Sequence, residues 1–380
     1  MLENKIYKYL SIEIFKNFII ILLTFTSIAW TVKAVNFLEL MIEDGYSGTI
    51  YLKYTLLNIF TIITRFVPLS FLLSLIISIT KFERQQELLI LWTMGLNKIK
   101  IANIFFLISC VLVLFQVTLG LVINPVTLNK SRALLRETET KQINSMLRTN
   151  SFSDAFKGTT FHIEEKNEKD ELINIFIKDS SGSLKTIISE LGNEDDTTIF
   201  AKKGFIKDNK LILFDGTIQT LNKKKEVKNI DFKKTKLSIN NFATRTITQP
   251  KIQETSSLIL YQCLINKNSD KVLQNCTSDK SKKNVTEALS RRLGMPLYIP
   301  LISVVASFLL IYKKEKKYNF VKKYLIFGIG FLILILAEIL LRYTGFSSLN
   351  FILYFLAPLI LFIFFYYFLI KNMNSEKLIK

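Results

Sequence analysis

The sequence KFERQQELLILWTMGLNKIK, residues 81–100, separates two long apolar stretches and decides how the rest of the chain is interpreted. Its opening residues favour a helix, an apolar face follows from Leu88 to Met94, and Gly95 stands where a helix C-cap is expected. The pattern predicts a short amphipathic helix over about residues 82–94, followed by a turn. Between two membrane spans, such a helix can lie on the bilayer or dock in a groove of a cytosolic partner. An ordinary connecting loop is the simpler alternative.

Composition places the chain in a membrane. Of its 380 residues 49% are hydrophobic, the mean hydropathy is +0.30, and only six are proline. That is too apolar for one ordinary soluble domain. Lysine and arginine exceed aspartate and glutamate by 50 to 31, but most of the excess lies outside the long polar middle of the chain. A nucleic-acid-binding domain would concentrate its charge differently, so we do not expect one.

Six apolar stretches are long enough to cross a bilayer as helices. They cover about residues 18–35, 56–80, 101–123, 293–312, 324–341 and 349–370. Residues 1–16 are expected to form a separate interfacial helix. The basic segments 81–100 and 313–323 each connect two spans, and the positive-inside rule assigns both to the cytosol. Both termini then face the cytosol, and the long insertion after span three lies outside.

The insertion, about residues 124–290, has no apolar run long enough to cross a bilayer. Alternating segments predict strands at 159–164, 173–177, 197–201, 210–214 and 217–221. Their spacing favours an antiparallel sandwich or jelly roll. The predicted fold is an α-helical membrane protein with six transmembrane helices and an inserted periplasmic antiparallel β-jellyroll domain. Its parts are an N-terminal membrane half (1–123), the β domain (124–254), a linker (255–290) and a C-terminal membrane half (291–380).

Active-site chemistry is missing from the sequence. There is no phosphate-binding loop of the G-x-x-x-x-G-K-[ST] type, and the single His162 cannot complete a zinc site. We therefore predict no catalytic residue, no metal and no cofactor, and transport would need ATP hydrolysis by another chain. Cys110 lies in a span, whereas Cys263 and Cys276 lie in the polar middle. If that part is extracytoplasmic, these two can form a disulfide, although their spacing does not require one.

Charged residues within or beside the spans are the better candidates for function, because burying a charge in hydrocarbon is costly. Lys33, near the outer end of span one, and Arg65, inside span two, are the candidate lipid-binding cations. For Lys33, as for Arg342, snorkelling to the interface is the simpler explanation. Glu338 precedes Arg342 by four residues in span five, so we predict that these two form a helix-surface ion pair.

A family resemblance adds to these patterns. The segments PLS at 68–70, QEL at 86–88 and MGL at 94–96 resemble the second span and the coupling helix of the LptF/LptG (YjgP/YjgQ) lipopolysaccharide-export permeases. The likeness covers nearly the whole chain, as three spans, a β-rich insertion and three further spans. It looks closer to the LptF branch than to LptG.

The resemblance implies a half-transporter of the bacterial inner membrane. Its partners would be a cytosolic ABC ATPase dimer, a second LptF/LptG-type permease as heterodimer, a periplasmic β-jellyroll bridge protein, and lipopolysaccharide as the cargo. Glu87 matches the glutamate that seats in a groove of the ATPase, with Arg84 and Gly95 as neighbouring coupling residues. Lys33 and Arg65 would hold the lipid phosphates beside an apolar cavity wall.

Two alternatives stay open. One is a permease for lipoproteins or another envelope lipid. The other is a structural or sensory membrane protein that displays a β domain and binds no ATPase.

A final expectation concerns strand edges in the β domain. We expect a free edge along strands 197–221, which would pair with a second periplasmic β protein. The lysines at 223–225 could instead protect such an edge against aggregation.

Overall fold

The computed structural model describes residues 2–42, 46–141, 149–156, 158–167, 171–180, 196–207, 210–221, 227–238, 251–265, 279–311 and 316–378. The chain divides into two compact units. The membrane unit comprises Met1–Val32, Leu57–Asn129 and Gln249–Lys380. The β unit comprises Lys33–Leu56 and Lys130–Thr248.

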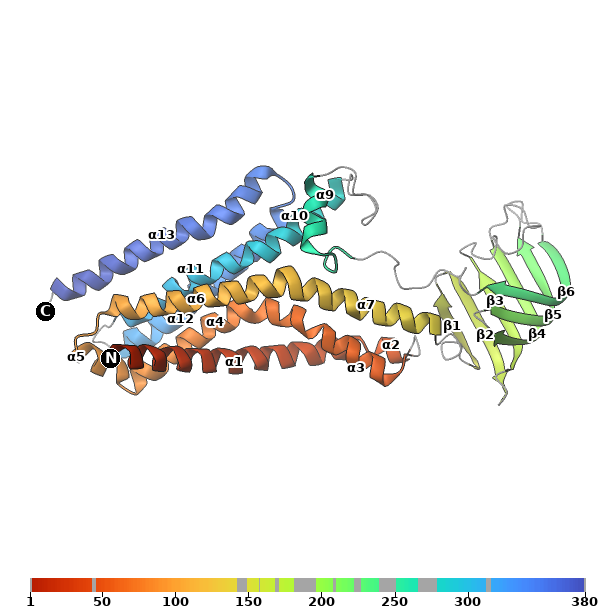
Figure 1. Ribbon diagram of the computed structural model, residues 1–380, viewed down its shortest axis with the longest axis horizontal. Coiled ribbons are helices and arrows are strands. Elements are labelled where there is room, and N and C mark those ends of the chain that lie inside the picture. The colour runs from red at the N-terminus through yellow and green to blue at the C-terminus, as the bar shows by residue number, and fades with distance from the viewer. Residues whose placement is uncertain are drawn as a thin grey trace. The chain divides into compact units, whose positions relative to one another are not determined.

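Among the described residues, six helical segments are long and apolar enough to cross a membrane, which confirms the predicted number of spans. The first is α1 (Leu2–Asn36). The second joins α3 (Gly48–Leu57) to α4 (Ile59–Arg84), and the third joins α6 (Lys98–Thr118), the π-helical turn η1 (Leu119–Ile123) and α7 (Asn124–Lys141). The fourth joins α10 (Asp279–Leu293), the 3₁₀ turn η4 (Met295–Leu297) and α11 (Tyr298–Ser307). The last two are α12 (Lys316–Tyr343) and α13 (Ser348–Leu378) (Figure 1).

Helix α11 forms the centre of the membrane unit, where it packs against α4, α6, α12 and α13. Its apolar side chains, such as Ile299 and Ile302, are fully buried. Small polar residues on the packed helices, including Ser74, Ser109 and Ser303, are buried as well. Because lipid is as apolar as leucine, membrane helices associate largely through such close packing. The buried serines therefore mark the surfaces where these spans meet.

Helix α1 runs without a break from Leu2 to Asn36, so the prediction of a separate interfacial helix over residues 1–16 was wrong. Leu10, Ile14, Phe18 and Leu22 are spaced four apart and are all buried in the core of the membrane unit. Residues four apart lie on one helix face. This stripe passes through the supposed junction, so both parts belong to one helix.

Span three also continues beyond its predicted end at Ile123. Pro125 has no N–H group, so the carbonyl oxygen of Leu121, four residues earlier, has no helical donor from that position. The π-helical turn η1 lies immediately before it. The hydroxyl of Ser257 donates to the Leu121 oxygen at 3.0 Å. With this acceptor satisfied from another segment, the helix proceeds into α7.

The β unit contains one antiparallel sheet. Its strands are β1 (Ser151–Phe156), β2 (Thr159–Lys166), β3 (Leu172–Asp179), β4 (Asp196–Lys207), β5 (Lys210–Leu221) and β6 (Val227–Ser238). Their order in the sheet follows their order in the chain (Figure 1). This confirms an inserted antiparallel β domain. The described strands form an up-and-down meander without the long Greek-key connection of a jelly roll.

One face of the sheet carries the core of the β unit. Phe161, Ile177, Ile199 and Leu213 belong to a buried apolar cluster supplied by successive strands. Alternation along each strand turns the intervening side chains to the other face. Close packing of strands is tightest at Gly216, where an added Cβ would lie 2.1 Å from the carbonyl oxygen of Phe200.

The sheet edges differ from those predicted. Residues 197–221 span β4 and β5, and both strands pair with neighbours on each side. The prediction that this segment forms the free edge was therefore wrong. Among the described strands, the two outer ones are β1 and β6. The lysines at 223–225 lie outside the described residues.

The segment predicted as a linker, 255–290, contains two packed helices, α9 (Ser257–Ile265) and α10. Leu260 and Cys263 of α9 are buried against Val285 of α10. Cys276 lies outside the described residues, so its disulfide with Cys263 stays a prediction. Cys110 is a free, exposed thiol on α6.

Candidate coupling site

The segment between spans two and three is divided into two helices. Helix α4 extends to Arg84, and Gln86 then takes a left-handed conformation with φ 57°. Helix α5 (Glu87–Thr93) begins at the next residue. Lys81 and Arg84 lie in the last turn of α4, where cations interact favourably with the helix dipole. Arg84 therefore lies at the end of span two. The predicted bounds of the coupling helix, 82–94, would have included it.

The far end of α5 is closed by Gly95. Its φ is +81°, a left-handed conformation that favours glycine. The amide of Gly95 donates to the carbonyl of Trp92 at 3.1 Å, and that of Leu96 donates to Leu91 at 3.1 Å. These two bonds make a Schellman motif, so Gly95 has the C-capping conformation that the sequence predicts. Asn97 then caps α6, with its side-chain oxygen accepting from the amide of Ile99 at 3.2 Å.

Helix α5 carries apolar residues on both its buried and its exposed side. Leu88 and Leu91 are buried in the core of the membrane unit. Leu89, Ile90 and Met94 are each more than half exposed. The buried pair fixes α5 on the bundle, and the exposed three, which we call the α5 apolar patch, remain available for contact with another molecule.

The carboxylate of Glu87 is held at the first turn of α5 by the first span. The hydroxyl of Tyr9 on α1 donates to Glu87 Oε1 at 3.1 Å. One turn further along α1, Glu13 forms an ion pair with Lys81 of α4. Tyr9 and Glu13 are four residues apart and therefore share a helix face. Together they tie α1 to both helices of the coupling segment.

The fifth span is tied to the same segment from α12. Lys323 Nζ lies 2.9 Å from Glu83 Oε2 on the last turn of α4. Lys98, at the start of α6, places its ammonium 5.5 Å from the centre of the Trp92 ring. The coupling segment therefore contacts charged or polar side chains from α1, α12 and α6. The contacts of α5 itself are those with Tyr9 of α1 and Lys98 of α6, whereas the α12 contact is made with α4.

The predicted lipid-binding cations lie apart from the coupling segment in sequence. Lys33 lies in the last turn of α1 and is half-buried. Arg65 lies in the first part of α4 and is exposed. They belong to different compact units, so their joint action on one lipid stays a prediction.

The ion pair predicted for span five was wrong. Arg291 of α10 donates from Nη1 to Glu338 Oε2 at 3.1 Å and from Nη2 to Oε1 at 2.8 Å. Such a bidentate contact is stronger than a surface pair along one helix. Arg342 is exposed. Among the described residues, no group of three or more His, Cys, Asp or Glu side chains is placed to hold a metal.

In the part of the chain that the structure describes, six apolar helices and an inserted antiparallel β domain define a polytopic membrane protein. The profile of a family described as "Lipopolysaccharide export system permease LptF/LptG" matches residues 8–372. The chain belongs to this family. No curated protein matches the sequence.

Proposed function

We propose that this chain is one permease subunit of an ATP-driven exporter that extracts lipopolysaccharide from the inner membrane. It would work beside a second LptF/LptG-type permease, with a separate cytosolic ABC ATPase dimer hydrolysing ATP. The termini and α5 would face the cytosol, and the β unit would face the periplasm. The observation that carries the proposal is the geometry of α5, which combines an exposed apolar patch with a carboxylate fixed at its first turn.

The α5 apolar patch fits the groove-binding mode of recognition, in which the apolar face of an amphipathic helix fills a groove of the partner. Leu89, Ile90 and Met94 would enter an apolar groove of the ATPase, and Glu87 would meet a donor at its rim. The bond from Tyr9 to Glu87 would carry movement of α5 to α1, and the ion pair of Lys323 with Glu83 would carry movement of the end of α4 to α12. ATP-driven closure of the ATPase dimer would thereby move spans in the membrane.

Lipopolysaccharide combines anionic phosphates with acyl chains. Arg65, which is exposed on α4, would bind the phosphates of lipopolysaccharide. The apolar face of the sheet would then shield acyl chains on the way to a periplasmic β-jellyroll bridge. Photocrosslinking from position 65 with lipopolysaccharide present tests the first part. Crosslinks to phospholipid alone, or to a neighbouring helix, would argue against it.

The coupling role is tested with Glu87→Ala in the full chain, expressed with its native partners. We expect the variant to insert and fold but to lose ATPase association on affinity purification, followed by mass spectrometry, and to lose lipopolysaccharide export. Glu39→Ala, which removes an exposed glutamate from α2 (Glu39–Ile42), is the control. Full ATPase association and export by Glu87→Ala would reject the assignment. Recovery of no ATPase with the native chain would favour a non-transport membrane protein.

A further inference from the structure

Helix α9 presents an apolar face that the described part of the chain does not cover. Leu258, Tyr261 and Ile265 are 76%, 58% and 60% exposed. Their spacing of three, four and seven residues places them on one side of the helix. On the opposite side, Leu260 and Cys263 are buried against α10. The helix is thus attached by one apolar face and leaves the other outward.

Arg292 fixes the approach to α9 and so the direction of that outward face. Its guanidinium is buried, and Nη2 donates to the carbonyl oxygens of Ile252, Gln253 and Thr255 at 3.3, 3.2 and 3.0 Å. Nη1 donates to the hydroxyl of Ser257, the first residue of α9, at 2.7 Å. Since one rigid group holds four acceptors, this turn is positioned accurately.

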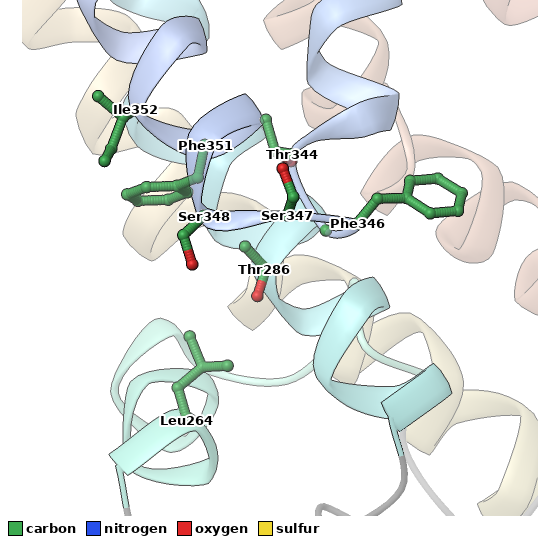
Figure 2. A pocket seen from close by; sticks show the side chains of 9 residues that line it. Leu264, Thr286, Thr344, Phe346, Ser347, Ser348, Phe351 and Ile352 are labelled. Atoms are coloured by element: carbon green, nitrogen blue, oxygen red, sulfur yellow. The ribbon is translucent and has the colours of Figure 1, made fainter.

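Helix α9 lies beside the ends of two spans. Leu264 lines a surface cavity of about 490 Å³ together with Ser347, Ser348 and Phe351 (Figure 2). Ser347 lies in the short turn that joins α12 to α13, and Ser348 begins α13. A short turn between two spans lies where the chain leaves and re-enters the bilayer. Helix α9 therefore lies beside the turn between the last two spans.

The cavity is lined by both hydroxyl groups and apolar side chains. Hydroxyl groups come from Thr286, Ser347 and Ser348, and apolar walls come from Leu264 and Ile352 (Figure 2). Glycerol and phosphate oxygens above acyl chains present the same two kinds of surface in a bilayer.

Exposed apolar side chains also occur along α13, whose first turn borders the cavity. Leu349, in the first turn of α13, is 73% exposed. Further along the same span, Leu353 and Leu356 are also exposed. Exposed apolar residues are therefore present both on α9 and on the span whose first turn borders the cavity.

We propose that α9 is an interfacial anchor whose exposed face rests in the glycerol and upper acyl region of the bilayer, with a phospholipid head group in the adjoining cavity. Tyrosine favours this depth, because its ring is apolar and its hydroxyl remains in contact with water and head groups. The choice of the periplasmic leaflet rests on the orientation given under the proposed function, whereas the contact with lipid does not. Arg292 acts here as a positioning residue.

The anchor is tested by tryptophan fluorescence of the full chain in nanodiscs of bacterial phospholipid. Trp30 and Trp92 are first replaced by phenylalanine, and the reporter Tyr261→Trp is then introduced. Acrylamide reports contact with water, and phospholipid brominated on the upper acyl chain reports contact with lipid. Leu353→Trp on α13 is the lipid control, and Lys251→Trp, on an exposed residue before α9, is the water control.

We expect brominated phospholipid to quench Tyr261→Trp about as strongly as Leu353→Trp, and acrylamide to quench it several-fold less than Lys251→Trp. Quenching by acrylamide at the level of Lys251→Trp would overturn the proposal. So would protection from both quenchers, which would mean that protein covers α9. If Tyr261→Trp fails to fold, Leu258→Trp gives the same readout from the same face. The assay needs neither ATPase nor lipopolysaccharide, so its failure leaves the export function untouched.

Discussion

Replacing Arg292 with methionine removes the guanidinium from a buried turn while keeping a side chain of similar length. Four acceptors then lose their donor, of which the Ser257 hydroxyl at 2.7 Å and the Thr255 carbonyl at 3.0 Å have the shortest bonds. A hydrogen bond to a charged group contributes about 1.5–3 kcal/mol, so the two short bonds together contribute about 3–6 kcal/mol. Part of this loss is offset, because the variant no longer pays the free-energy cost of burying a charge. Among the described residues, no ion pair of Arg292 is found to compensate that cost in the native chain.

The free energy of local opening of the turn and of α9 should therefore fall by about 2–4 kcal/mol. At 1.4 kcal/mol per tenfold change, local opening should rise about 30-fold to several hundred-fold. Hydrogen exchange with mass spectrometry, on peptides covering residues 251–265 in nanodiscs, measures this opening. The control is Arg342→Met, which removes an exposed arginine from α12. If exchange in 251–265 rises no more in Arg292→Met than in this control, the network does not hold α9.

Three further expectations follow from described contacts. Tyr9→Phe removes the hydrogen bond to Glu87, worth about 1 kcal/mol, and should weaken ATPase association about fivefold in a titration, with the protein amount unchanged. Phe152→Cys on the outer strand β1 should crosslink to a periplasmic β partner, whereas Phe200→Cys, exposed on the inner strand β4, should not, and equal crosslinking would reject β1 as the docking edge. Gly216→Ala should destabilise the β unit by about 1–3 kcal/mol, because its Cβ would lie 2.1 Å from a carbonyl oxygen. Limited proteolysis of the β unit checks this, with Gly48→Ala, where an added Cβ meets nothing within 4 Å, as the control.

Features of the fold that depend on local sequence patterns could be predicted from the sequence. Each span is a run of apolar residues, and the strand predicted at 173–177 lies within β3 because side chains alternate there between a buried and an open face. Gly95 could be assigned to a helix end, since left-handed backbone strongly favours glycine. These signals are local, so neighbouring residues suffice to detect them.

Features that depend on distant contacts could not be predicted. Glu338 has an arginine four residues away, yet it pairs with Arg291, 47 residues earlier in the chain. Glu87 accepts a bond from Tyr9, 78 residues away. The order of strands, which makes 197–221 the interior of the sheet, is likewise a matter of long-range pairing. Only the spacing of Tyr9 and Glu13 on one face of α1 hinted at the coupling contacts.

The break after α4 was missed for a different reason. Gln86 is in the left-handed region, where asparagine and glycine are common and glutamine is rare. The run of helix-forming residues therefore did not indicate that the helix would break at Gln86.

The central place of α11 has a consequence for how the protein is made. Ribosomes deliver the chain from its N-terminus. The described strands of the β unit pair with their sequence neighbours, so this unit has the local contacts of a domain that folds as soon as it emerges. The helix that α4 and α6 pack against emerges only afterwards. The first three spans must therefore wait in the bilayer with those surfaces uncovered. Helix α11 then enters beside α4 and α6, which were inserted before it, and α12 and α13 complete the packing around it.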